Sequence, residues 1–213
     1  MKLMIITDSW ESVRGLHERR GTGEHYHLDD WVTSMDRRHS YERRKNPQYN
    51  IPVTKHLKEI VSFLQKERNV SVLVVEPSQC KLISVPKIPG LKVARNPWKT
   101  RNLLRGFNPT HVHIATEGPL GLYYRWLLMW KKQKFTTSFF DIDFPSHLKK
   151  YWGFPTGASW EYLRKFHAPS SRIIVPTSFI KKMLTMWRFE NEIVIKEDTD
   201  HMQIFENALI PRV

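Results

Sequence analysis

Residues 110–145, THVHIATEGPLGLYYRWLLMWKKQKFTTSFFDIDFP, decide the fold of this chain. A short apolar run ends at Thr116, a segment of helical length follows, and a second apolar run covers residues 135–140. This succession predicts a strand, a helix and a second strand. Pro119 suits the first helical turn, and Lys131 and Lys132 suit the last one, where cations are favourable. We therefore expect one βαβ unit.

Acidic residues follow both strands of this unit. Glu117 comes after the first strand, and Asp141 and Asp143 come after the second. Parallel strands end at the same edge of a sheet, and ligands of open α/β sheets bind at that carboxyl edge. The sequence thus predicts a ligand site that contains these three carboxylates.

The rest of the chain continues the alternation of strand and helix. The apolar runs predict strands at 2–7, 70–75, 91–94, 172–175 and 193–195, and the helical spacings predict helices at 53–68, 97–107, 156–167 and 178–187. In the helix at 97–107, Trp98, Leu103, Leu104 and Phe107 are expected to face inward. We expect an α/β, Rossmann-like, doubly wound and mainly parallel sheet of six or seven strands with helices on both faces.

Composition limits the cell compartment and the partners. The chain has 213 residues, a single cysteine, and no apolar run near the ~20 residues of a membrane span. These features predict a cytoplasmic protein in a reducing compartment. The net charge of +13 favours anionic partners, namely phosphorylated substrates, an acidic membrane face or nucleic acid. A surface that is simply basic and soluble explains the charge equally well.

Five motifs resemble one enzyme family. They are HIATEGPLG at 113–121, FTTSF at 135–139, FPSHL at 144–148, YLRKFH at 162–167 and VPTSFIKKML at 175–184. This set resembles the retaining glycosyltransferases of family 4, which have the GT-B fold, especially the mannosyl- and sulfoquinovosyl-type enzymes that use a nucleotide sugar. TDSW at 7–10 and PQYN at 47–50 are similar to the family's first strand end and the loop directly after it, so residues 11–46 would be an insertion.

The resemblance implies a domain organisation. Residues 1–213 would form the N-terminal, acceptor-side half of a GT-B enzyme, with the C-terminal nucleotide-binding half absent. The chain would then work with a separately encoded half, as a homo-oligomer, or as a reduced enzyme. The resemblance makes five residues candidates for substrate contact: Asp8, Asn50, Gly118, Arg164 and Lys165. Asn50 is equally well explained as a turn residue before Pro52, and Arg164 and Lys165 as solvated helix charges.

Two family features are replaced in this sequence. The family's loop glycine is replaced here by the continuation Ile51-Pro52, and its histidine near the sugar by Phe140-Asp141. The triplet Asp141-Ile142-Asp143 offers hard oxygen ligands for a divalent cation, Mn²⁺ or Mg²⁺, that would bridge a diphosphate. The alternative is that these aspartates are solvated or cap a helix. A set of histidines and aspartates at 24–30 is interpreted as a polar loop rather than a metal site.

Three functions follow from these observations. The first is a glycosyltransferase-type domain that transfers, or helps transfer, a hexose from a nucleotide sugar to a glycan, a lipid or another acceptor, with Glu117, Asp141 and Asp143 as catalytic candidates. The second is a non-catalytic module that binds glycan, an anionic membrane surface or nucleic acid. The third is a single-domain, metal-dependent transferase using Asp141 and Asp143. We interpret His111, His113 and His167 as structural.

Overall fold

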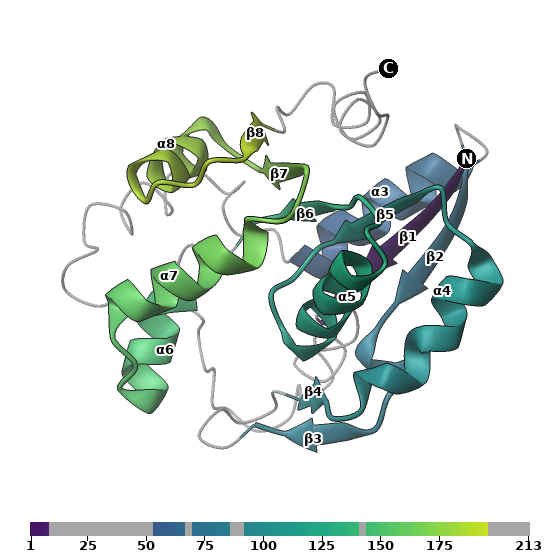
Figure 1. Ribbon diagram of the computed structural model, residues 1–213, viewed down its shortest axis with the longest axis horizontal. Helices are drawn as coiled ribbons and strands as arrows, with labels where there is room; N and C mark the ends of the chain where they lie inside the picture. The colour runs from purple at the N-terminus through teal and green to yellow at the C-terminus, as the bar shows by residue number, and fades with distance from the viewer. Residues whose placement is uncertain (9–52, 67–69, 86–91, 141–143, 196–213) are drawn as a thin grey trace, which may run out of the picture.

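The computed structural model describes residues 1–8, 53–66, 70–85, 92–140 and 144–195 (Figure 1). Its centre is a six-stranded sheet in which all neighbouring strands run parallel, in the order β2-β1-β5-β6-β7-β8. The strands are β1 (Lys2–Ile6), β2 (Ser71–Val75), β5 (His111–Ile114), β6 (Thr136–Ser138), β7 (Arg172–Val175) and β8 (Glu192–Ile195). The predicted α/β fold with a parallel sheet is confirmed.

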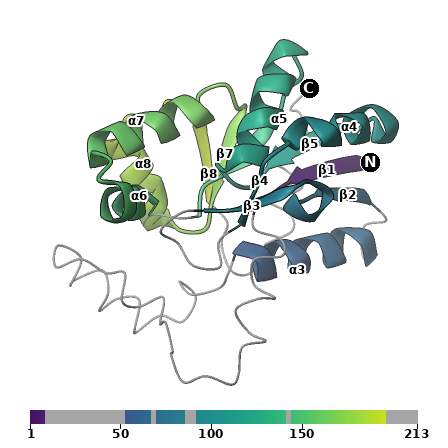
Figure 2. The same ribbon diagram turned by 90° about the horizontal axis from the view of Figure 1, so that it is seen from below.

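Helices cover both faces of this sheet. Helix α3 lies on one face, and α4 and α5 lie on the other (Figure 2). Ile114 packs in the cluster of α5, and Ile173 packs in the cluster of α7 and α8. Both are register partners of Thr137, and register partners in parallel strands point to the same face of the sheet. Helices α7 and α8 therefore share the face of α5. The helices are α3 (Val53–Lys66), α4 (Arg101–Phe107), α5 (Pro119–Trp130), α6 (Phe144–Trp152), α7 (Thr156–His167) and α8 (Ser178–Met186).

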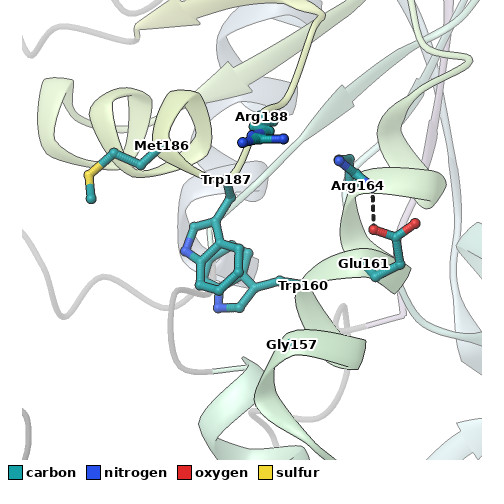
Figure 3. Close-up of a pocket in the computed structure, with 7 residues that line it drawn as sticks. All are labelled: Gly157, Trp160, Glu161, Arg164, Met186, Trp187 and Arg188. Carbon is teal, nitrogen blue, oxygen red and sulfur yellow. Dashed lines mark hydrogen bonds and ion pairs between the residues drawn. The ribbon is translucent and has the colours of Figure 1, made fainter.

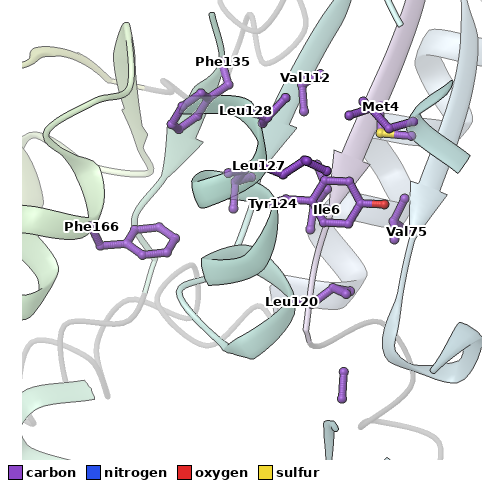
Figure 4. Packing of buried hydrophobic residues seen from close by; sticks show 13 residues of the cluster. Met4, Ile6, Val75, Val112, Leu120, Tyr124, Leu127, Leu128, Phe135 and Phe166 are labelled. Atoms are coloured by element: carbon purple, nitrogen blue, oxygen red, sulfur yellow. The ribbon is translucent and has the colours of Figure 1, made fainter. Parts of the chain in front are cut away.

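Strand β1 divides the core in two. Met4 and Ile6 pack with the inner side of α5 (Figure 4), whereas Leu3 and Ile5 pack with α3. Successive side chains of a strand point to opposite faces, so a strand covered on both sides favours apolar residues on both. This explains the apolar run from Leu3 to Ile6 in β1.

The structure differs from the sequence prediction in three places. Helix α6 forms where no helix was predicted. Pro145 is compatible with this helix because it lies in the first turn, where a backbone N–H would have no partner within the helix. The connection at 77–90 contains a 3₁₀ turn (Pro77–Gln79) and β3 (Leu82–Ser84), which pairs antiparallel with β4 (Lys92–Ala94). The inward placement of Trp98 was wrong: its side chain is 60% exposed. It lies in a 3₁₀ turn (Pro97–Thr100), whose three-residue period differs from that of α4.

Several predictions lie outside the described residues. They concern Asn50, Asp141, Asp143, the insertion at 11–46 and the tail at 196–213. Among the helices that the structure describes, none combines the length and apolar character needed to cross a bilayer.

Candidate functional site

The strand order reverses between β1 and β5. The chain passes from β1 to β2 on one side and then returns to β5 on the other. In open parallel sheets, the carboxyl ends of the two strands at such a reversal flank the ligand site. Asp8 follows β1 there, and Glu117 and Gly118 follow β5. The fold thus brings three of the predicted site residues to one edge.

The carboxylate of Asp8 holds the first turn of α5. Its Oδ1 accepts a hydrogen bond from the backbone N–H of Leu120 at 2.9 Å, and its Oδ2 accepts one from Gly121 at 3.1 Å. Thr116 adds a reciprocal pair, since its Oγ1 accepts from the Asp8 N–H at 2.7 Å and donates to Oδ2 at 3.1 Å. Burial raises the pKa of Asp8, against the lowering effect of the two backbone bonds. Asp8 therefore positions this edge by satisfying donors of the helix N-terminus.

Two glycines leave room for the close contacts at the start of α5. Gly118 is the N-cap residue of α5, and Pro119 opens the helix. A Cβ added to Gly118 would lie 2.4 Å from Cγ of Asp8, and one added to Gly121 would lie 2.0 Å from the carbonyl oxygen of Thr116. Both distances are shorter than van der Waals contact, so these positions exclude larger residues in the observed backbone.

Glu117 is held from two sides. Its Oε1 lies 3.2 Å from Nε2 of His167, and its backbone carbonyl accepts a hydrogen bond from the Tyr162 hydroxyl at 2.7 Å. Burial, together with the charges of Glu117 and Asp8, raises the pKa of Tyr162 to about 12, so the phenol keeps its proton. The Glu117 side chain is 13% exposed. Within the described residues, no hydrogen bond reaches its second oxygen, Oε2.

His167 connects Glu117 to the sheet. Its ring is fully buried, and its Nδ1 lies 2.8 Å from Oγ1 of Thr137 in β6. Arg125 of α5 fixes the same helix end by donating to the backbone carbonyls of Phe166 and Lys165 at 2.8 and 2.7 Å. The interpretation of His167 as structural agrees with its burial and its contact with Thr137. Its contact with Glu117 was missed, because no local pattern relates the end of α7 to the loop after β5.

His113 has a structural place. It is fully buried, with Nδ1 2.9 Å from Oγ1 of Thr136 and Nε2 3.3 Å from Oγ of Ser138. Ser138 donates its hydrogen to the carbonyl of Ala115, so it accepts one from Nε2. Burial lowers the pKa of His113 to about 3, which keeps the ring neutral. The structural interpretation of His113 is therefore confirmed.

Arg164 and Lys165 form ion pairs along α7. Both pair with Glu161, Arg164 through its Nη2 and Lys165 through its Nζ at 3.3 Å, and the Lys165 side chain is 75% exposed.

Arg164 borders a pocket of about 310 Å³ between α7 and the end of α8 (Figure 3). The indoles of Trp160 and Trp187 stack in its wall with ring centroids 4.9 Å apart. The pocket is lined by Gly157, Trp160, Glu161, Arg164, Met186, Trp187 and Arg188.

A metal site is not present in the part of the chain that the structure describes, where no three His, Cys, Asp or Glu side chains converge. Asp141 and Asp143 lie outside that part. Their role as ligands of a divalent cation stays a prediction.

The sequence model of Glycosyltransferase Family 4 matches residues 53–195. The chain belongs to this family, and the match spans α3 to β8, including Glu117 and His167 but not Asp8. Comparisons with curated proteins and with solved structures found no match. Membership of a glycosyltransferase family implies a sugar donor and an acceptor as substrates.

Proposed function

We propose that this chain is the acceptor-side domain of a GT-B glycosyltransferase, transferring or helping to transfer a hexose from a nucleotide sugar to a glycan or lipid. The observation that carries the proposal is the placement of Glu117, in a family 4 domain, at the strand-order reversal of the sheet. The carboxylate is oriented by His167, and the backbone beside it by Tyr162.

Glycosyl transfer breaks the bond between the anomeric carbon and the diphosphate and forms a bond to an acceptor oxygen, which loses its proton. A carboxylate suits the acceptor side of this reaction, because it accepts strong hydrogen bonds from sugar hydroxyls. We assign this role to Oε2 of Glu117. Asp8 and Gly118 act on the same site indirectly, by positioning the first turn of α5 beside it.

The departing diphosphate needs positive charge. In the GT-B arrangement, a nucleotide-binding half that faces this domain would provide it. In the alternative single-domain enzyme, Asp141 and Asp143 would hold Mn²⁺ or Mg²⁺ against the diphosphate. Asn50 and the Arg164 pocket are further places where substrate would bind, and Lys165 would add an exposed cation next to that pocket.

A thermal-shift panel on the full chain tests the proposal. The ligands are UDP, GDP, GDP-mannose, UDP-sulfoquinovose and free hexoses, each with and without Mn²⁺. A ligand that binds only the folded state stabilises it by about 2.7 kcal/mol at a hundredfold excess over its dissociation constant. A hexose-dependent shift without metal supports an acceptor half, and a nucleotide shift that needs Mn²⁺ supports the single-domain alternative.

A pair of variants connects any shift to the proposed site. Glu117→Gln keeps an acceptor for His167 but removes the charge, so a sugar-dependent shift should shrink or disappear. Glu190→Gln, at an exposed carboxylate, is the matched control and should leave the shift unchanged. A sugar-dependent shift of equal size in wild type and Glu117→Gln would reject Glu117 as a ligand residue.

A further inference from the structure

Helix α5 is apolar on both sides. Its inner side, with Tyr124 and Leu127, is buried in the core. Its outer side exposes four large apolar residues at helical spacing, which we call the α5 tryptophan face: Leu122, Trp126, Met129 and Trp130. Trp126 and Trp130 are 60% and 66% exposed, and their rings stack at a centroid distance of 6.4 Å with an interplanar angle of 4°. Large apolar groups gathered on one surface usually mark a binding site.

Cations border the α5 tryptophan face. Lys131 and Lys132 follow Trp130 directly, and both are exposed. The guanidinium of Arg101 in α4 lies 5.8 Å from the Trp130 ring centroid. Between positions 97 and 134 the sequence has seven lysines and arginines and a single acidic residue, Glu117. Because Glu117 precedes the helix at its opposite end, the charge beside Trp130 is positive.

We propose that the α5 tryptophan face docks on the surface of an anionic lipid bilayer. Tryptophan is enriched at the boundary between headgroups and acyl chains, because its ring is apolar and its N–H is polar. Lysines at the same depth attract acidic headgroups. The aliphatic Leu122 and Met129 favour acyl chains over nucleic-acid bases as the apolar partner. Adjacent exposed lysines favour a membrane over a protein partner, whose interfaces are depleted in lysine.

The surface and the proposed sugar site lie on the same helix. Glu117 lies two residues before α5, whose 12 residues span about 18 Å. A bilayer against Trp126 and Trp130 therefore lies within roughly one helix length of Glu117. Bilayer docking does not rest on the proposed sugar chemistry, since it is measured without any sugar or nucleotide.

Vesicle sedimentation of the full chain is the test. The probes are vesicles of phosphatidylcholine alone and of phosphatidylcholine with phosphatidylglycerol. Wild type should sediment with the anionic vesicles only, and less strongly as salt is raised. The double variant Trp126→Ala/Trp130→Ala should bind at least about tenfold more weakly, since each loses a large interfacial side chain. Lys131→Gln/Lys132→Gln should lower binding by about fivefold per lysine.

Matched controls separate the surface from overall charge and from folding. Lys181→Gln/Lys182→Gln removes the same charge from exposed positions on α8, and Trp152→Ala removes an exposed tryptophan from α6. Both should bind like wild type. Thermal unfolding checks that every variant folds; if the tryptophan variant does not, the two lysine variants still decide the question.

Four results would overturn the proposal. The first is no sedimentation of wild type with anionic vesicles, and the second is equal loss of binding in the α5 and α8 lysine variants. The third is a concentration-dependent dimer, seen by light scattering, that Trp126→Ala/Trp130→Ala dissociates, because the occupant would then be a second copy. The fourth is binding of a single-stranded oligonucleotide through the same residues without vesicle binding.

Discussion

Nε2 of His167 lies 3.2 Å from Oε1 of Glu117, although 50 residues separate them in the sequence. The contact joins the last residue of α7 to the loop after β5, and Thr137 of β6 holds the other ring nitrogen. The His167 side chain therefore connects α7, β6 and the loop after β5 at the edge where the proposed sugar site lies.

His167→Leu should destabilise the protein by about 2–3 kcal/mol, because it leaves both Thr137 and Glu117 without their buried partner. Urea unfolding monitored by tryptophan fluorescence measures the loss. A double-mutant cycle with Glu117→Ala, which removes the contact, should give a coupling energy of about 1 kcal/mol, since the two side chains are in direct contact. Additive effects of the two changes would mean that the 3.2 Å contact contributes nothing.

Gly118→Ala should destabilise the protein by about 1–3 kcal/mol, the usual cost of inserting a group where there is no room. The new methyl would meet the Asp8 carboxylate, which would have to leave the first turn of α5. Gly106→Ala in α4 is the control, because an added Cβ there meets nothing within 4 Å. That change should be neutral or stabilising, by up to about 1 kcal/mol, since alanine favours helix. Equal effects of the two changes would contradict the role of Gly118.

Asp8→Ala should cost about 2 kcal/mol, at the upper end for helix caps, because it removes the acceptor of two backbone N–H groups at once. Thr177→Ala at the start of α8 is the comparison. It removes a single capping bond, from Ile180 N–H at 3.3 Å, and should cost about 0.5–1 kcal/mol. Unfolding midpoints in urea rank the two variants, and the reverse ranking would contradict the assignment of Asp8 as the stronger cap.

His113 should make the protein less stable as the pH falls from about 6.5 toward 3. The unfolded imidazole binds a proton below about pH 6.5. In the folded state, burial lowers the pKa of His113 to about 3. Between these values the unfolded state holds the extra proton, so stability falls by up to about 1.4 kcal/mol per pH unit.

His113→Gln isolates this effect. The glutamine does not titrate, so the variant should have a shallower dependence of unfolding free energy on pH between 4 and 6, although it is less stable at pH 7. Parallel urea titrations of both proteins across this range make the comparison. Identical slopes would show that His113 does not set the acid sensitivity.

Local patterns predicted most of the sheet. The βαβ unit at 110–145 and the helix at Thr156–His167 follow from period and capping residues, and the structure has a helix with those same bounds. The edge position of Glu117 followed from the rule that parallel strands end together, whereas Asp8 became a candidate through the family resemblance of residues 7–10. These features depend on residues close in sequence or on the general geometry of parallel sheets.

The missed features depend on contacts between distant segments. Asp8 holds α5 across 112 residues, a role that its position at a strand end does not reveal. The stack of Trp160 on Trp187 and the contact of His167 with Glu117 arise only when α7 is placed on the sheet. Trp98 was assigned inward from a single helical period, and the 3₁₀ turn broke that period.

The fixed setting of Glu117 has a consequence for the kinetics of recognition. A flexible glutamate would lose side-chain freedom when it bound a sugar, at about 0.5–1.5 kcal/mol for each immobilised side chain. In the folded protein His167 and Tyr162 already restrict the Glu117 carboxylate and its backbone. The side-chain entropy is therefore lost before any sugar binds. Sugar association at this carboxylate should therefore follow a single fast phase whose rate rises linearly with sugar concentration, without a slow reorganisation step.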